Sequence, residues 1–369
     1  MLMMCKMLMM QHRGSLRERT ARDVGTLILL CGGASAEHEV SLASARSVLA
    51  AINGSRLVRP IVIGRDGKLL GQRQSLALLG LEACGEDVRL DELEPVHPEG
   101  LSALDFAEDD VVFPLLHGPF GEDGSVQGLL RLLGVPHVGS GVLASAVGMD
   151  KLTMKAVFAA HGLPQVPYRG LSLHAYRRDR EAALATLREL GLPAFVKPAN
   201  LGSSLGIHRA EHADALCDAL DDAFGFDRRV IVETALIGCR ELEVAVLGND
   251  VAELSPVGEI RYRAPFYDYA SKYEPGGAEL LIPAPIPPQV AERATTLARR
   301  AFEAIDGAGL ARVDLFYDER AGDVLVNEIN TMPGFTATSM FPRLWAAAGL
   351  EYEALIERLV ELARQRARA

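Results

Sequence analysis

Oxygen-bearing side chains interrupt two apolar runs between residues 311 and 330 of this sequence. Both runs are rich in residues that favour β-strands, and turn-prone residues separate them, so we predict a β-hairpin. Side chains two positions apart on a strand share a face. We therefore expect Glu328 and Asn330 to lie on the same face as Val324 and Val326.

On the first strand of this hairpin, Arg312 and Asp314 share a face with Phe316. Carboxylates that lie close together on a half-buried surface repel each other or bind protons, unless a cation neutralises them. Oxygen ligands suit magnesium or manganese, and magnesium held by few carboxylates completes its shell with substrate phosphates. We therefore predict a metal site at Asp314, Glu328 and Asn330, with a solvated edge hairpin as the alternative.

The composition excludes several classes of protein. The chain has 369 residues, of which 49% are hydrophobic, which is typical of a globular protein of about two or three domains. A net charge of −11 argues against nucleic acid or an anionic membrane as the main partner. The five cysteines are scattered and lack C-x-x-C spacing, so we expect no disulfide framework or zinc site and a reducing compartment.

A first strand near residues 25–30 leads through a glycine-rich turn into a predicted helix. This order is typical of an open α/β sheet, in which ligands meet the loops at the carboxyl ends of the strands. Glu37 lies on the first such loop, and His117 follows a later strand, so we expect the two side chains to be neighbours. A structural histidine is the alternative.

A loop rich in glycine and serine, residues 198–206, follows a predicted strand that ends at Lys197. Its N–H groups beside a lysine are suited to phosphate. Only six of the 38 basic residues are lysines, and a lysine provides a compact point charge that arginine does not. No P-loop or dinucleotide fingerprint is present, so we predict a phosphate site of another kind, with a flexible turn as the alternative.

Two further segments of the sequence are expected to contribute to the site. Residues 230–236 and 241–247 are predicted to form a pair of strands. The polar and aromatic segment at residues 267–277 is predicted to be a mobile loop that carries function.

Taken in order, the segments that carry these features resemble the D-alanine:D-alanine ligases of the ATP-grasp superfamily. They extend over most of residues 25–365, and their joint order and spacing is highly specific. The matching segments are GGASAEHEVSL, LLHGPFGEDGSVQG, GSGVLASAVGMDK, FVKPANLGSSLGI, VIVETALIGCRELEVAVLGND, FYDYASKY, ARVDLF and VNEINTMPGFTATSM.

The resemblance implies an α/β protein with the ATP-grasp fold and an amino-terminal open α/β (pre-ATP-grasp) domain. It places this substrate-binding domain at residues 25–148 and a central ATP-grasp subdomain at 149–230. The carboxyl-terminal ATP-grasp subdomain, with the metal and catalytic residues, would occupy 231–369, and ATP would be bound between the last two units. Residues 1–24 have no counterpart and are expected to be a disordered or misassigned extension.

The resemblance also implies which residues bind ATP. Lys151 and Lys197 would contact the phosphates, Glu233 and Leu236 the adenine edge, and Glu241 the ribose. The full set implied for ATP is Lys151, Lys197, Ser203, Ser204, Glu233, Thr234, Ala235, Leu236 and Glu241.

For the amino-acid substrates, Glu37 would receive the ammonium group of the first D-alanine, and Ser339 would contact the carboxylate of the second. Arg312 and the N–H group of Gly334 would stabilise the oxyanion, and Lys272 would contact the transferred phosphate. The implied catalytic residues are Glu37, Ser203, Lys272, Tyr273, Arg312, Gly334 and Ser339. The implied substrate-binding residues are Glu37, His117, Ser339 and Met340.

The implied reaction is ATP-dependent ligation of two D-alanine molecules through an acyl phosphate, for peptidoglycan precursor synthesis. The resemblance implies that the enzyme uses ATP and two magnesium or manganese ions. It also implies a homodimer in the cytoplasm, without a nucleic-acid or membrane partner. The alternatives are D-serine or D-lactate as the acceptor, an inactive nucleotide-binding regulator, and an oxidoreductase built on the first βα unit. Relatives that make D-alanyl-D-lactate lack the pair Lys272–Tyr273, which is intact here and favours an amine acceptor.

Overall fold

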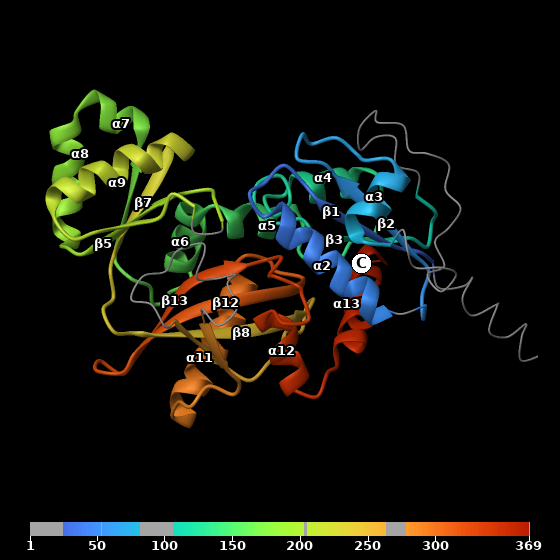
Figure 1. Cartoon of the computed structure of the whole chain (residues 1–369). Helices are drawn as coiled ribbons and strands as arrows, with labels where there is room; N and C mark the ends of the chain where they lie inside the picture. The colour runs from blue at the N-terminus through green and yellow to red at the C-terminus, as the bar shows by residue number, and fades with distance from the viewer. Residues whose placement is uncertain (1–24, 53, 82–105, 203–204, 263–277, 369) are drawn as a thin grey trace, which may run out of the picture.

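The computed structural model describes residues 25–52, 54–81, 106–202, 205–262 and 278–368. Within these ranges the strands form three sheets, each with helices beside it (Figure 1). The mixed α/β class predicted from the sequence is confirmed. No helix in the described ranges combines the length and the hydrophobicity needed to cross a membrane.

An open parallel sheet forms the first unit. In this sheet β1 (Leu27–Gly32) lies between β2 (Val58–Ile63) and β3 (Val111–Pro114). Every residue of β1 is buried, as expected for a parallel strand that is covered on both faces. α2 (His38–Ile52) begins just after β1, so the connecting loop lies at the carboxyl edge of the sheet. Further helices in this region are α3 (Gln72–Leu79), α4 (Ser125–Leu132) and α5 (Val142–Met149).

The core of this first unit is completed by helices from much later in the sequence. α13 (Tyr352–Arg368) packs against α2 and β3, and Figure 1 shows it in red beside the blue α2. Leu355 and Leu359 of α13 are fully buried in the same cluster as Leu42 of α2. α12 (Met340–Ala347) contributes to this cluster as well.

The second sheet is antiparallel and has the order β4-β7-β5-β6. Its strands are β4 (Tyr168–Ser172), β5 (Ala194–Pro198), β6 (His208–Ala210) and β7 (Arg229–Thr234). The helices beside it are α7 (Leu173–Arg178), α8 (Arg180–Leu187) and α9 (Ala213–Phe226). This unit, green to yellow in Figure 1, lies at the opposite end of the molecule from the first sheet.

The third sheet has the order β11-β10-β8-β12-β13, with β9 paired to β8. Its strands are β8 (Arg240–Gly248), β9 (Glu253–Leu254), β10 (Gly258–Tyr262), β11 (Ala278–Leu281), β12 (Gly309–Asp318) and β13 (Asp323–Asn330). The amphipathic helix α11 (Pro288–Ala304) packs on one face, where its Leu297 and Phe302 join the core with Val244 of β8.

The two runs predicted as a strand pair lie in different sheets. β7 pairs with β4 and β5, whereas β8 pairs with β10 and β12, so the predicted pairing is wrong. Both runs are apolar and adjacent in sequence, and this pattern does not indicate whether the two strands lie in one sheet or in two.

β7 also crosses position 230, where we expected the central unit to end. We therefore propose that this boundary lies between β7 and β8.

The predicted hairpin is confirmed as the antiparallel pair β12–β13, but a bulge changes which of its side chains share a face. The register skips Asn327, and one extra residue reverses the alternation of the strand beyond it. Val324 and Val326 are fully buried, whereas Glu328 and Asn330 lie on the partly exposed face. The expectation that these four side chains share one face is therefore wrong.

Candidate active site

Four polar side chains share the open face of the β12–β13 hairpin. Arg312 lies opposite Asn330, and Asp314 lies opposite Glu328. Directly opposed side chains on antiparallel strands have Cβ atoms about 5 Å apart. The fold therefore brings together the three predicted metal ligands and places Arg312 beside them.

Asp314 is hydrogen-bonded by two of these neighbours. Arg312 donates from Nε to Asp314 Oδ1 at 2.6 Å and from Nη2 to Oδ2 at 2.7 Å, and Asn330 donates to Oδ2 at 3.0 Å. Glu243 of β8 lies across from Asp314 on the other side, with its Oε2 atom 3.2 Å from Arg312 Nε. Burial lowers the pKa of Arg312, but the charges of Asp314 and Glu243 outweigh it and hold this pKa well above its usual value. Arg312 is therefore a fixed cation in the site.

The donor set fits a hard divalent cation. Within the described ranges no three His, Cys, Asp or Glu side chains gather as a metal-binding group, and this set consists of two carboxylates and one amide. Two carboxylates and an amide oxygen leave room in a magnesium shell for water or phosphate oxygens. Asp314, Glu328 and Asn330 are thus suited to hold a cation that also contacts a phosphorylated substrate.

Two lysines hold the carboxylate of Glu233 at the end of β7. Lys197 of β5 lies 2.6 Å from Glu233 Oε2, and Lys155 of α6 (Lys151–Ala160) lies 3.1 Å from Oε1. Burial raises the pKa of Glu233, but Lys155 and Lys197 outweigh it and lower this pKa to about 2. For Lys197 burial acts to lower the pKa, and the charges of Glu233 and Glu328 raise it overall. Burial lowers the pKa of Lys155, against the raising effect of the charge of Glu233. With both lysines protonated, the cluster carries one anion and two cations.

Lys151 begins α6 and connects this cluster to the hairpin. Its Nζ atom donates to the carbonyl of Leu201 at 2.7 Å and lies 3.9 Å from Glu328 Oε2. Its backbone N–H donates to Ala199 at 2.8 Å. Lys151 thus contacts both the segment that enters the glycine-rich loop and a carboxylate of the third sheet, and the charge of the same carboxylate raises the pKa of Lys197.

Glu37 lies between two loops that belong to different units. A Cβ atom added at Gly118 would lie 3.1 Å from Glu37 Oε2, and one at Gly202 would lie 3.0 Å from the same oxygen. Any side chain other than glycine would crowd the carboxylate at both positions. Ser35 connects the loop that carries Glu37 to the loop that carries His117. Its Oγ atom donates to the carbonyl of His117 at 2.7 Å and accepts from the N–H of Glu37 at 3.2 Å. The predicted neighbourhood of Glu37 and His117 is therefore confirmed.

His117 is buried and prepared to accept a hydrogen bond. Its Nδ1 atom donates to the carbonyl of Met332 at 3.1 Å, and its Nε2 atom has no hydrogen-bond partner within the described part of the chain. Burial lowers the pKa of His117, against the raising effect of Glu37. A neutral imidazole in this tautomer presents Nε2 as an acceptor next to a carboxylate, which suits a substrate ammonium group.

Glu122 is a further buried acid beside this pair. It accepts a hydrogen bond from the N–H of Gly118 at 2.6 Å. Burial, followed by the negative charge of Glu37, raises the pKa of Glu122 to about 8. The hydrogen bond from His117 to Met332, two residues after Asn330, connects this cluster to the end of the hairpin. The charge of Arg312 also lowers the pKa of both Glu122 and His117.

The residues predicted to bind the second substrate surround the beginning of α12. Ser339 is the N-cap residue of this helix, and its Oγ atom lies 2.7 Å from Thr336 Oγ1 and 3.3 Å from a Cβ atom added at Gly334. Helix N-termini attract carboxylates. The side chain of Met340 is buried in the core, where its sulfur packs against Gly258, so only its backbone faces this region.

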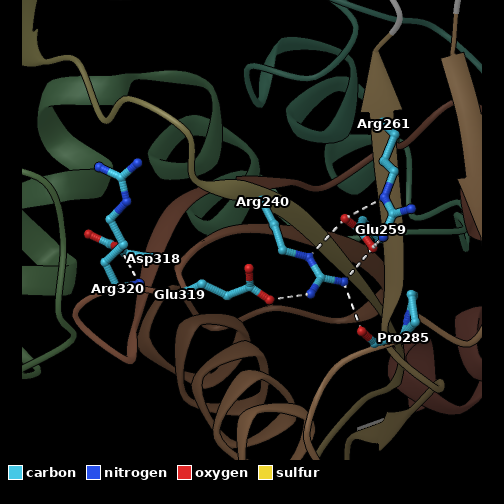
Figure 2. A network of polar contacts seen from close by, with 7 residues as sticks. All are labelled: Arg240, Glu259, Arg261, Pro285, Asp318, Glu319 and Arg320. Carbon is cyan, nitrogen blue, oxygen red and sulfur yellow. Dashed lines mark hydrogen bonds and ion pairs between the residues drawn. The ribbon is translucent and has the colours of Figure 1, made fainter.

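The predicted adenine edge is the segment that leaves β7. The N–H of Ala235 donates to Pro193 at 3.0 Å, and Thr234 Oγ1 donates to Leu190 at 3.1 Å. Leu236 and Glu241 are both partly exposed. Figure 2 shows Arg240, the residue before Glu241, held between Glu259 and Glu319 on the third sheet.

Four of the predicted site residues, Ser203, Ser204, Lys272 and Tyr273, lie outside the described residues. The structure also adds to the site three residues that were not predicted from the sequence: Lys155, Glu243 and Glu122. A signal for Lys155 existed, because residues four apart on a helix share a face and Lys151 was already implicated. Glu243 is two positions after Glu241 on a strand, which also places the two on one face.

An open parallel α/β domain, followed by two antiparallel sheets with facing lysines and carboxylates, is the architecture of the ATP-grasp enzymes. The two halves of the chain match the family described as D-ala D-ala ligase, its N-terminus over residues 26–140 and its C-terminus over residues 157–361. This chain belongs to the D-alanine–D-alanine ligase family.

Individual relatives agree with this assignment. The chain is 52% identical over 341 residues to a D-alanine–D-alanine ligase of Deinococcus radiodurans, which covers 91% of this chain and 98% of that protein. It is 48% identical over 344 residues to the one of Bacillus velezensis, covering 91% and 96%. The structure of the D-alanine-D-alanine ligase from Coxiella burnetii superposes with a TM-score of 0.77 at 34% identity, covering 93% of this chain and 94% of that one. VanG D-Ala:D-Ser ligase from Enterococcus faecalis superposes with a TM-score of 0.76 at 32% identity, covering 92% and 99%. The predicted ATP-grasp fold is thereby confirmed.

Proposed function

We propose that this chain ligates two molecules of D-alanine at the expense of ATP, for peptidoglycan precursor synthesis. Its family is that of ATP-dependent ligases, its curated relatives are named D-alanine–D-alanine ligases, and a role in cell-wall synthesis follows from the family. The observation that carries the proposal is Glu37, whose carboxylate lies against Gly118 of the first unit and Gly202 of the glycine-rich loop. An amino acid bound there lies next to the loop that is suited to the phosphates of ATP.

In the first step, Glu37 and His117 Nε2 receive the ammonium group of the first D-alanine and direct its carboxylate toward Arg312. A carboxylate oxygen attacks the γ-phosphorus of ATP, so that an O–P bond forms and ADP leaves. Lys151 and Lys197 hold the phosphates during this transfer, and Asp314, Glu328 and Asn330 would hold the metal. When bound, magnesium or manganese neutralises the phosphate oxygens and aligns them.

In the second step, the amine of the second D-alanine attacks the carbonyl carbon of the acyl phosphate. A C–N bond forms, the C–O bond to phosphate breaks, and the amine loses a proton. Arg312 and the N–H group of Gly334 stabilise the oxyanion, while Ser339 and the N-terminus of α12 receive the acceptor carboxylate. Ser203, Lys272 and Tyr273 complete the proposed site from the two loops that exclude water.

We also propose two metal ions per site, a homodimer and a cytoplasmic location. The number of ions is an expectation from the family resemblance, and the donor set is compatible with it because it leaves coordination positions for phosphate oxygens. The location agrees with the free cysteines Cys31, Cys217 and Cys239.

The test is phosphate release by the purified protein with ATP and each of D-alanine, D-serine and D-lactate, alongside NADH oxidation. We expect release with D-alanine alone and identification of the dipeptide as its product. Release that requires D-serine would favour the acceptor of the VanG ligase, which is the second candidate because that enzyme superposes over 92% of this chain. No release with any of the three would contradict the proposal.

A further inference from the structure

We propose that Lys155 is a positioning residue for ATP, because it neutralises Glu233 and so leaves the charge of Lys197 available to the phosphates. The inference rests on the proposed function, in which Lys197 contacts these phosphates. It assigns a task to a lysine that lies too deep to touch the substrate itself.

The three charged groups come from three different elements. Lys155 lies on α6, Lys197 on β5 and Glu233 at the end of β7. Each carboxylate oxygen of Glu233 has one lysine, with Lys155 at 3.1 Å from Oε1 and Lys197 at 2.6 Å from Oε2. The side chains of Lys155 and Glu233 are 1% and 3% exposed, whereas that of Lys197 is 12% exposed. Only Lys197 therefore reaches toward the open site.

The net charge of this cluster determines how strongly it attracts a phosphate group. Glu233 carries one negative charge, and Lys155 and Lys197 carry one positive charge each, so the sum is one positive charge. Without Lys155 the sum is zero, and Glu233 would hold Lys197 as its only partner in the cluster. Charges a few ångströms apart in a poorly solvated site interact strongly. The loss of Lys155 therefore weakens the attraction of the cluster for phosphate.

Stability of the fold does not explain a lysine at this position. Burying an ammonium group is costly, and hydrophobic residues of similar volume replace buried ion pairs without loss of stability in many proteins. The ring of Tyr168 lies 5.6 Å from the Nζ atom of Lys155, a contact that favours a cation over a neutral side chain. The charge is therefore better explained by Glu233 than by packing.

The position of Lys155 also connects the two phosphate lysines. Residues four apart on a helix lie one above the other, so Lys151 and Lys155 share a face of α6. The backbone of this helix is held by Gln165, which donates to the carbonyl of Lys155 at 3.0 Å. The ion pair to Glu233 thus fixes α6 against the second sheet, with Lys151 at the beginning of the same helix.

The experiment measures binding of ATP and of adenosine by calorimetry, without D-alanine, to the wild type and two variants. Lys155→Met should weaken ATP binding about tenfold or more and leave adenosine binding unchanged, because only ATP carries phosphates. The double variant Lys155→Met/Glu233→Gln should recover most of the ratio of ATP affinity to adenosine affinity, since its cluster again carries one positive charge. The ratio is the readout because Glu233 is also assigned to the adenine edge, and a change there weakens both ligands alike.

Three outcomes would overturn the inference: unchanged ATP binding by Lys155→Met, equal weakening of ATP and adenosine binding by Lys155→Met, or no recovery of the ratio of ATP to adenosine affinity in the double variant. Thermal unfolding of each variant shows whether it is folded, and a variant that fails to fold is replaced by Lys155→Gln with the same readouts. Failure of the proposed function is distinguishable, because a wild type that binds ATP but forms no dipeptide leaves the binding comparison intact.

Discussion

Arg312 and Asp314 lie two residues apart on β12 and form a double hydrogen bond, with N···O distances of 2.6 and 2.7 Å. The charge of Asp314 is thus partly neutralised before any metal binds. The pair with Arg312 holds the Asp314 carboxylate in place, whereas the proposed chemistry of the hairpin requires the cation.

Asp314→Ala and Glu328→Ala should each nearly abolish turnover while the protein remains folded. Each variant removes a metal ligand and also relieves repulsion between the two carboxylates. Phosphate release and thermal unfolding measure the two effects. Asp323→Ala, at the exposed start of β13, is the matched control and should retain activity. Wild-type turnover in excess EDTA would contradict the metal assignment.

D-Alanyl-D-alanine should be the dominant product when D-alanine and D-lactate are supplied in equal amounts near neutral pH. The acceptor must attack as a free amine, so dipeptide formation should fall as the pH drops and the ammonium fraction grows. A hydroxyl acceptor has no such titration. Mass spectrometry of the products decides the matter, and mainly depsipeptide would show that the acceptor is assigned wrongly.

Tyr273→Phe should lower kcat more than it weakens ATP binding. The resemblance assigns its hydroxyl to the groups around Glu37 and Ser203, which act on the amino acid and not on the nucleotide. Steady-state kinetics with varied ATP separate the two effects. An unchanged kcat would remove Tyr273 from the catalytic residues.

His137 should make the protein less stable in mild acid. Arg366 of α13 donates to His137 Nε2 at 2.8 Å, and burial, followed by the charge of Arg366, lowers the pKa of His137 to about 4 from 6.5. The unfolded chain therefore binds this proton first as the pH falls below 6.5. The free energy of unfolding should lose on the order of 3 kcal/mol by pH 4 from this group. His137→Gln keeps an acceptor, and urea unfolding from pH 7 to 4 should show a shallower decline; an equal decline would refute the role of His137.

Arg240→Met should destabilise the third sheet more than Arg261→Met does. Arg240 binds Glu259 through two hydrogen bonds, of 2.9 and 2.6 Å, and also reaches Glu319 and the carbonyl of Pro285 (Figure 2). The side chain of Glu259 is 2% exposed, whereas that of Arg261 is 48% exposed. Removing one partner of a buried pair costs about 3 kcal/mol or more, although Arg261 offsets part of the loss. Chemical unfolding of both variants tests the order.

The hairpin with its ligands was predictable because two strand-forming runs and a turn are local signals. The face on which Glu328 and Asn330 lie was not, because the bulge at Asn327 arises from pairing with β12 and leaves no mark in the alternation of a single strand.

Among the charged side chains as well, contacts that follow from local sequence signals were predictable, and contacts that depend on long-range packing were not. Glu37 and His117 were predictable as neighbours, since both follow strands of one parallel sheet. The ion pair between Lys155 and Glu233 joins a helix to a strand 78 positions away. Buried lysines are rare, and their partners depend on how whole units pack.

The packing of α13 against β3 and α2 has a consequence for the order of folding during synthesis. The first sheet leaves the ribosome early, but the leucines of α13 that close its core emerge only after both other sheets. Until then the unit carries an uncovered apolar surface, which is the condition that recruits chaperones. The segment translated first is in this way among the last to reach its final packing.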